Sequence, residues 1–186
     1  MPHFISTVVI VAMITLFLSP TTGFVNKLIE ILGGQAVNFM TKPEDFTMIY
    51  AVSGVWQNMG WSSIIYLAAL AAVDPEQHES AVIDGASRLQ RILYINIPSI
   101  LPTIVVVLIL STGSVMNVGF EKVFLLSNDS LLEKSEVIAT YTYRVGIYGG
   151  QLSLSSAIGL FNSTVNFVIL VLVNSICKHL GDTSIW

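Results

Sequence analysis

The chain has 186 residues, of which 53% are apolar and 11% charged, and its formal net charge is -4 at pH 7. An average soluble domain is about one quarter charged, so this composition argues against a soluble globule. The acidic balance and the lack of a basic run argue against nucleic-acid binding. A lone cysteine (Cys177) rules out an intrachain disulfide or a thiolate cluster, and the three histidines lack ligand spacing, so no metal site is predicted.

Four long runs without a formally charged side chain predict membrane-spanning helices. Each run exceeds the roughly 20 residues that a helix needs to cross about 30 Å of hydrocarbon. The predicted spans are about His3 to Ser19, Met48 to Ala72, Ser99 to Val118, and Ser153 to Lys178. The prediction is an all-α membrane protein with about four transmembrane helices, in which both termini and residues 74–98 share one side of the membrane.

The first predicted span has no Lys or Arg before its apolar run. It therefore lacks the basic region of a secretory signal, and we expect it to stay in the membrane. The Lys and Arg residues outside the spans do not fix the orientation, because the loops are long and the two sides differ little in positive charge.

The segment between the second and third spans is charged. Five charged residues lie between Glu76 and Arg91, and burying them in mid-bilayer would cost on the order of 15 kcal/mol. Asp74 followed by Pro75 predicts the start of a short helix, with Gln77 spaced for a capping box.

A second helix start follows within the same segment. Asp84 and Gly85 predict a turn in which glycine takes a positive φ, and Ser87 with Gln90 repeats the capping-box spacing. The segment is thus predicted to be a short helix, a glycine turn and an amphipathic helix. One interpretation places this pair on lipid headgroups. Its acidic first helix favours a partner protein instead, because anionic headgroups repel carboxylates.

The residues of this segment carry a family resemblance. Glu79-Ser80-Ala81, Asp84-Gly85-Ala86 and Ile95-Asn96-Ile97-Pro98 resemble the "E-A-A, D-G-A, I-x-L-P" motif of binding-protein-dependent ABC importer permeases. Ser80 replaces the first motif alanine, and Ile97 replaces the leucine. The stretches "GVWQNMGWSSIIYLAALAAVDPE" and "GLFNSTVNFVILVLVNSICKHLG" are similar to the lipoprotein-dependent oligosaccharide and polysaccharide branch of that family.

The resemblance implies the permease fold of type I ABC importers, in a bacterial cytoplasmic (inner) membrane. Residues 1–186 would form one partial permease domain that lacks two N-terminal spans, and residues 74–98 would be its cytoplasmic coupling loop. The residues assigned to ATPase coupling are Glu79, Ser80, Ala81, Asp84, Gly85, Ala86, Ile95, Ile97 and Pro98.

By the same resemblance, the predicted function is a permease subunit of an ATP-driven importer for oligosaccharides. The expected partners are a cytoplasmic ABC ATPase dimer, a second permease, an extracellular substrate-binding lipoprotein, the oligosaccharide and the lipid bilayer. The chain is not expected to be an enzyme or to bind a cofactor, since it has no GxxxxGK[ST] phosphate loop. ATP and Mg²⁺ would belong to the ATPase.

Sugars suit hydroxyls, amides and aromatic faces, which recur at helical spacing inside the predicted spans. These side chains are candidates for a substrate path, and the alternative is ordinary helix packing or, for tryptophan, interfacial anchoring. The candidates are Trp56, Gln57, Trp61, Ser111, Ser114, Asn117, Asn162 and Asn166.

Two other functions are compatible with the composition. A truncated, non-transporting membrane remnant would keep the motif without moving cargo. An ion-coupled secondary carrier would need an intramembrane acidic residue in most cases, and none of the predicted spans has one in its interior.

Overall fold

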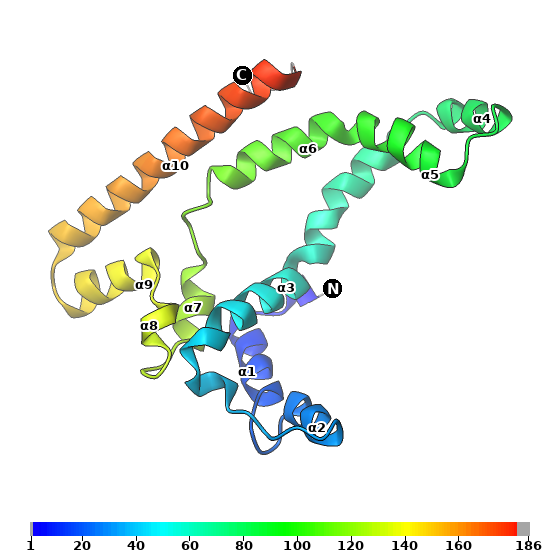
Figure 1. The fold of residues 1–186 in the computed structure, drawn as a ribbon. Coiled ribbons are helices and arrows are strands. Elements are labelled where there is room, and N and C mark those ends of the chain that lie inside the picture. The colour runs from blue at the N-terminus through cyan, green and yellow to red at the C-terminus, as the bar shows by residue number, and fades with distance from the viewer. Residues whose placement is uncertain (1, 182–186) are drawn as a thin grey trace. The chain divides into compact units, whose positions relative to one another are not determined.

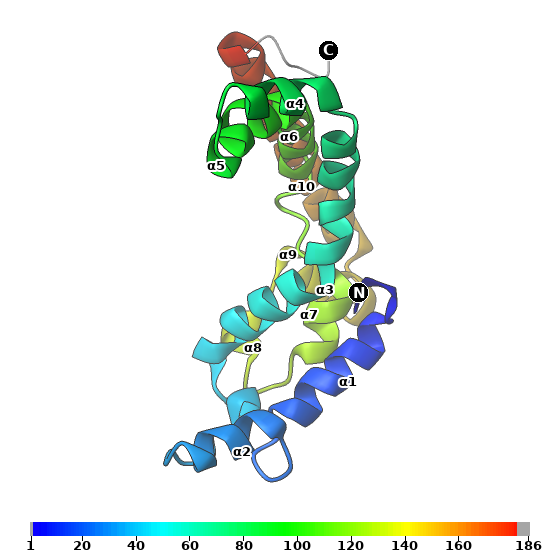
Figure 2. The same ribbon diagram turned by 90° about the vertical axis from the view of Figure 1, so that its right-hand side faces the viewer.

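The computed structural model describes residues 2–181, in which every regular element is helical. Packing divides the chain into two compact units (Figures 1 and 2). Unit 1 comprises Met1–Gly60 and Asn117–Asn162, and unit 2 comprises Trp61–Met116 and Ser163–Trp186. The predicted domain also included Met1 and residues 182–186, which lie outside the described residues.

Unit 1 is built around a small apolar core. Its elements are a 3₁₀ turn (Pro2–Phe4), α1 (Thr7–Phe17), α2 (Phe24–Ile31), a second 3₁₀ turn (Phe39–Thr41), the first part of α3 (Pro43–Ala71), α7 (Phe120–Leu126), α8 (Leu132–Ser135), α9 (Ile138–Tyr143), a π-helical turn (Arg144–Tyr148) and the start of α10 (Leu152–Gly181). α1 and α7 lie side by side (Figures 1 and 2), and the buried core contains Val11, Phe46, Val123, Leu126 and Leu131.

A buried asparagine holds the connection between α1 and α3. Asn26 in α2 is 2% exposed, and its Nδ2 lies 2.9 Å from the Ser19 carbonyl oxygen and 3.0 Å from that of Val37. Its Oδ1 accepts a hydrogen bond from the Val37 N–H at 2.8 Å. The predicted loop from Pro20 to Thr47 is therefore folded around one amide.

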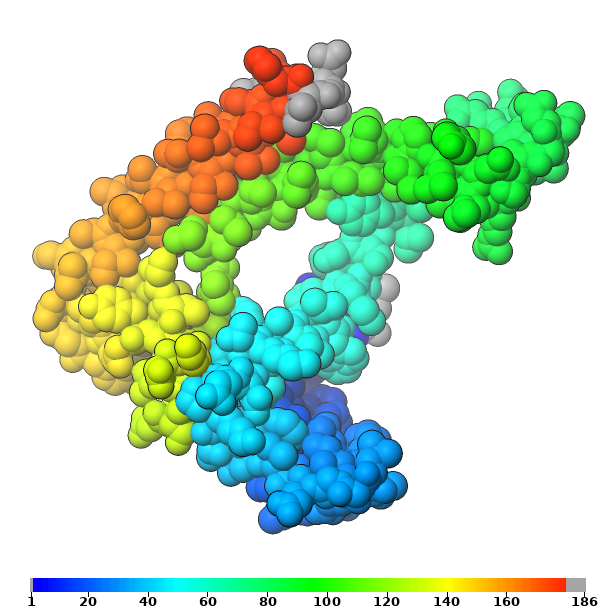
Figure 3. All heavy atoms as spheres, in the orientation of Figure 1, coloured from blue at the N-terminus to red at the C-terminus, as the bar shows by residue number. Residues whose placement is uncertain are grey.

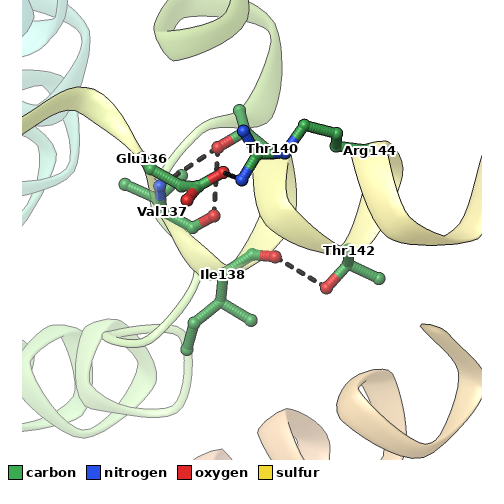
Figure 4. Close-up of polar contacts among 6 residues, drawn as sticks. All are labelled: Glu136, Val137, Ile138, Thr140, Thr142 and Arg144. Carbon is green, nitrogen blue, oxygen red and sulfur yellow. Dashed lines mark hydrogen bonds and ion pairs between the residues drawn. The ribbon is translucent and has the colours of Figure 1, made fainter. Parts of the chain in front are cut away.

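The predicted loop between the third and fourth spans also contains structure. α9 begins where the Val137 N–H donates to Thr140 Oγ1 at 3.0 Å, and Thr142 Oγ1 donates to the Ile138 carbonyl oxygen one turn on (Figure 4). Glu136 and Arg144 form an ion pair beside this start. Gly150 has φ 66° and lies two residues before α10 begins at Leu152.

Unit 2 contains the end of α3, α4 (Pro75–Ile83), α5 (Arg88–Arg91), a π-helical turn (Ile92–Asn96), α6 (Ile97–Thr112) and the rest of α10. α5, the π turn and α6 form one uninterrupted helix from Arg88 to Thr112. We predicted a separate amphipathic helix followed by a span that begins at Ser99, and that boundary is wrong.

The helix continues because a wider turn precedes Pro98. Proline has no backbone N–H and its ring crowds the preceding turn. The Ile97 N–H donates to the Ile92 carbonyl oxygen, five residues back, which is the spacing of a π turn. Ser99 Oγ donates to the Ile95 carbonyl oxygen at 2.7 Å. The wider turn and this side-chain bond accompany a helix that continues through Pro98.

Two helices of the described residues are long and apolar enough to cross a bilayer, Arg88–Thr112 and Leu152–His179. The first predicted span is corrected, because α1 has only 11 residues and therefore rises about 16 Å. α3 has 29 residues and confirms a continuous helix over the second predicted span, but polar residues along it, such as Gln57 and Asn58, make it less apolar than the other two.

Candidate functional site: the α4–α5 segment and the polar residues of the long helices

α4 starts as its sequence predicts. Asp74 is the N-cap, and its carboxylate accepts a hydrogen bond from the Glu76 N–H at 2.9 Å. Pro75 occupies the first turn, where its missing N–H costs nothing. The cap bond runs to Glu76 rather than to Gln77, so Asp74 caps the helix without the predicted box.

The turn after α4 depends on a glycine. Gly85 has φ 78°, a region that L-residues with a Cβ rarely adopt. The Gly85 N–H donates to the Val82 carbonyl oxygen at 3.0 Å, and the Ala86 N–H donates to that of Ala81 at 2.8 Å. This pair of bonds is the Schellman motif, which satisfies the last carbonyls of a helix and reverses the chain.

The following helix is capped by the predicted box. Ser87 Oγ accepts a bond from the Gln90 N–H at 3.4 Å, and Gln90 Oε1 accepts a bond from the Ser87 N–H at 2.7 Å. Since both ends of the turn are fixed by local hydrogen bonds, α4 and the start of the long helix are held in one geometry. In Figures 1 and 3, the α4–α5 segment projects beyond the adjoining ends of α3 and α6.

A shallow groove of about 210 Å³ lies inside this turn. It brings together three of the motif residues and three that the motif does not include: Ala81, Ala86, Ile95, Gln90, Arg91 and Tyr94. Arg91 Nε is buried and has no hydrogen-bond partner among the described residues. Glu79, Ser80 and Asp84 are exposed on α4 and its C-cap, outside the groove, and Ile97 and Pro98 are exposed where α6 begins.

The outer surface of α4 combines charge with exposed apolar side chains. Glu76, Glu79 and Asp84 are all exposed, and Ile83 at the end of the helix is 86% exposed. Together with Val82, Ile83 presents apolar surface beside a glycine turn whose backbone is fixed.

The eight predicted substrate-path residues are distributed over both units, and none lines the groove described above. Ser111 and Ser114 donate to carbonyl oxygens of their own chain three residues back. Trp56 and Trp61 are about half exposed on α3, and Gln57 is half-buried.

The asparagines of α10 hold the chain that follows α6. In unit 1, Asn162 Nδ2 donates to Asn117 Oδ1 at 2.9 Å, and Asn162 Oδ1 is buried with no hydrogen-bond partner within residues 2–181. In unit 2, Asn166 is 6% exposed and its Oδ1 accepts a bond from the Met116 N–H at 3.2 Å. These contacts favour a tethering role for Asn117, Asn162 and Asn166, which is the alternative that the sequence left open.

One cation that is buried among the described residues was not predicted from the sequence. Lys122 in α7 is 8% exposed, and its Nζ lies 5.4 Å from the centre of the Tyr50 ring of α3. Burial lowers the pKa of Lys122, because it disfavours the charged ammonium. Tyr50 in turn accepts a hydrogen bond from the Gly119 N–H at 3.2 Å.

Comparison with known proteins identifies the class. The sequence model of the family described as "binding-protein-dependent transport system inner membrane component" matches residues 1–181, and the chain belongs to this family. The family is described as a membrane component of transport systems. The all-α permease fold predicted from the sequence is thereby confirmed.

Three similar proteins show which members of the family this chain resembles. The chain is 40% identical over its whole length to the polygalacturonan/rhamnogalacturonan transport system permease protein YteP and to the protein LplB, both of Bacillus subtilis strain 168. It also matches, with a TM-score of 0.95 and 40% identity, a chain in the crystal structure of a bacterial alginate ABC transporter in complex with an alginate pentasaccharide-bound periplasmic protein. The chain spans 58% of the length of each Bacillus relative and 64% of the alginate-transporter chain.

Proposed function

We propose that the chain is a permease subunit of an ATP-driven importer for oligosaccharides in a bacterial cytoplasmic membrane. The observation that carries this proposal is the α4–α5 segment, in which a Schellman turn at Gly85 and a capping box at Ser87 fix an exposed helix at the start of a 25-residue apolar helix.

The surface of α4 fits a protein partner better than lipid. Three exposed carboxylates would be repelled by anionic headgroups, and Ile83 is almost fully exposed at the point where the chain reverses. The partner in this proposal is a cytoplasmic ABC ATPase dimer, which also binds the ATP and Mg²⁺. The residues proposed for coupling are those of the motif: Glu79, Ser80, Ala81, Asp84, Gly85, Ala86, Ile95, Ile97 and Pro98.

The proposed mechanism is alternating access driven by the ATPase. Closure of the ATPase dimer on ATP would displace α4, and the continuous helix that follows would carry the displacement into the membrane. A binding site can switch sides only if ATP binding changes the relative free energies of the two states. A second permease would complete the path, and Trp56, Gln57, Trp61, Ser111 and Ser114 remain candidates to line it.

The names of the relatives support an oligosaccharide cargo and a substrate-binding protein as a partner. YteP is named for polygalacturonan and rhamnogalacturonan transport, and one alginate-transporter structure contains an oligosaccharide-bound periplasmic protein. A second, which matches with a TM-score of 0.93 over 97% of this chain, is described as importing the acidic polysaccharide alginate. We therefore propose oligosaccharides cut from polysaccharides as the cargo, delivered by an extracellular binding lipoprotein.

Crosslinking tests the docking step. In the full-length permease with Cys177→Ser, a photoreactive crosslinker attached to Glu79→Cys should capture the ATPase subunit. The same crosslinker at Phe167→Cys, an exposed position in α10, should not. Capture of lipid alone from position 79, or labelling of that cysteine only from outside intact cells, would contradict the proposal.

A further inference from the structure

Lys122 is a buried charge that neither the fold nor the proposed coupling uses. Its Nζ is buried and has no hydrogen-bond partner among the described residues, although an ammonium can donate three bonds. The ion pairs described in the structure do not include it. The ring of Tyr50 gives the ammonium a cation–π contact at 5.4 Å, and such contacts stabilise by about 0.5–2 kcal/mol.

That contact does not offset the burial of an unpaired charge. Taking an ammonium out of water costs several kcal/mol unless it is paired. A methionine or leucine would fill the same space without this cost. Buried charges in proteins are normally paired, so a retained buried cation without an ion-pair partner among the described residues points to an anionic partner from outside them.

Lys122 Nζ lies beside one face of α3. Tyr50, Gly54 and Gln57 are spaced by four and three residues, which places them on one face of a helix. A Cβ built on Gly54 would lie 3.8 Å from Lys122 Nζ. Because Gly54 has no side chain, the ammonium lies against the helix face that carries the proposed path residue Gln57.

The same helix face carries no competing charge. From Phe46 to Val73 the chain has no Asp, Glu, Lys or Arg. A carboxylate that reached Lys122 would meet a cation with no acidic residue on the part of α3 that follows Asp45. The nearest acidic residues in the sequence are Glu44 and Asp45 in the first turn of α3 and Glu121 beside Lys122 in α7. The flexible four-carbon stem of lysine allows Nζ to rotate past Gly54 toward such a group.

We propose that Lys122 binds a carboxylate of the cargo, so that the importer selects oligosaccharides that contain uronic acids over neutral ones. The inference rests on the proposed importer function and adds to it the charge of the substrate. The sugar rings would pack on the neutral face of α3 while Nζ donates charge-assisted hydrogen bonds to the carboxylate.

The test uses the complete importer, with the full-length permease, second permease, ATPase and binding protein in proteoliposomes. Uptake is measured for oligogalacturonates and for the same oligosaccharides with their carboxyl groups reduced to alcohols. A charge-assisted hydrogen bond contributes about 1.5–3 kcal/mol, so Lys122→Met should lower oligogalacturonate uptake by about tenfold to a hundredfold and leave uptake of the reduced form within about twofold.

Lys134→Met is the matched control, because Lys134 lies on the neighbouring α8 and is exposed. It should leave both uptakes unchanged. An equal loss of both substrates in Lys122→Met, no loss of either, or loss of the second permease from the purified complex would overturn the inference. A wild-type importer that takes up the reduced sugars but no uronate would overturn it while the proposed function stands. A complex that imports neither sugar with ATP would contradict the proposed function itself.

Discussion

Replacing Gly85 by valine tests whether the shape of the α4–α5 turn transmits ATPase motion. No atom of the described part of the chain lies within 4 Å of a Cβ built on Gly85, so the substitution adds backbone strain without a steric clash there. A side chain in the left-handed region costs about 1–2 kcal/mol, and a β-branched one lies at the upper end of that range or above it.

At about 1.4 kcal/mol per factor of ten, 2 kcal/mol lowers the ratio of formed to unformed turn roughly thirtyfold. If coupling requires the formed turn, Gly85→Val should strongly reduce both uptake and the ATP hydrolysis that the loaded binding protein stimulates in proteoliposomes. Gly85→Asn should lose less, because asparagine tolerates this conformation better than valine.

The chain contains a matched control for backbone strain. Gly33 has φ 86° after α2, and none of the atoms described for residues 2–181 lies within 4 Å of its built Cβ. The Gly34 N–H donates to the Ile29 carbonyl oxygen at 2.8 Å. Gly33→Val therefore imposes the same kind of strain in unit 1. Full coupling in Gly85→Val, or an equal loss in Gly33→Val, would refute the reasoning.

Three further outcomes follow from single contacts. Ser87→Ala removes the N-cap and should weaken protection of the first amides of α5 from hydrogen exchange by about 1 kcal/mol, whereas Ser80→Ala, at an exposed site, should not. Asn26→Leu leaves buried carbonyl and N–H groups unpaired and should lower the free energy of unfolding by about 3 kcal/mol, unlike Asn38→Leu at an exposed position. The pKa of Lys122 is lower in the folded chain than its ordinary value of 10.5, so between these two pKa values the unfolded chain binds more protons than the folded one. The melting temperature should therefore rise with pH in that range, and Lys122→Met should abolish the rise.

The features predicted correctly from the sequence are those fixed by near neighbours. The caps at Asp74 and Ser87 and the positive φ of Gly85 each depend on bonds to residues at most five positions away. Their energies do not change with the packing of the rest of the chain. The α4–α5 segment was therefore predictable in detail, except for which amide Asp74 would cap.

Features that depend on distant residues could not be predicted in this way. Lys122 and Tyr50 are 72 positions apart, and no periodic pattern connects them. Asn26 resembles any other polar residue in a connecting segment until its bonds to Val37 are known. The length of the first predicted span was overestimated for another reason. A run without charged residues sets only an upper limit on the length of a helix, and α1 ends at Phe17, before Pro20.

The error at Pro98 has a consequence for coupling. A proline after a capped short helix favours a break, and a break would leave a hinge between α5 and α6. The structure instead has a π turn with a bond from Ile97 to Ile92, so the helix from Arg88 runs without interruption for 25 residues, about 37 Å. Because a continuous helix bends far less than a loop, displacement of α4 by a partner would move α6 rather than be absorbed at Pro98. The proline that suggested a separation thus lies within the element best suited to transmit motion.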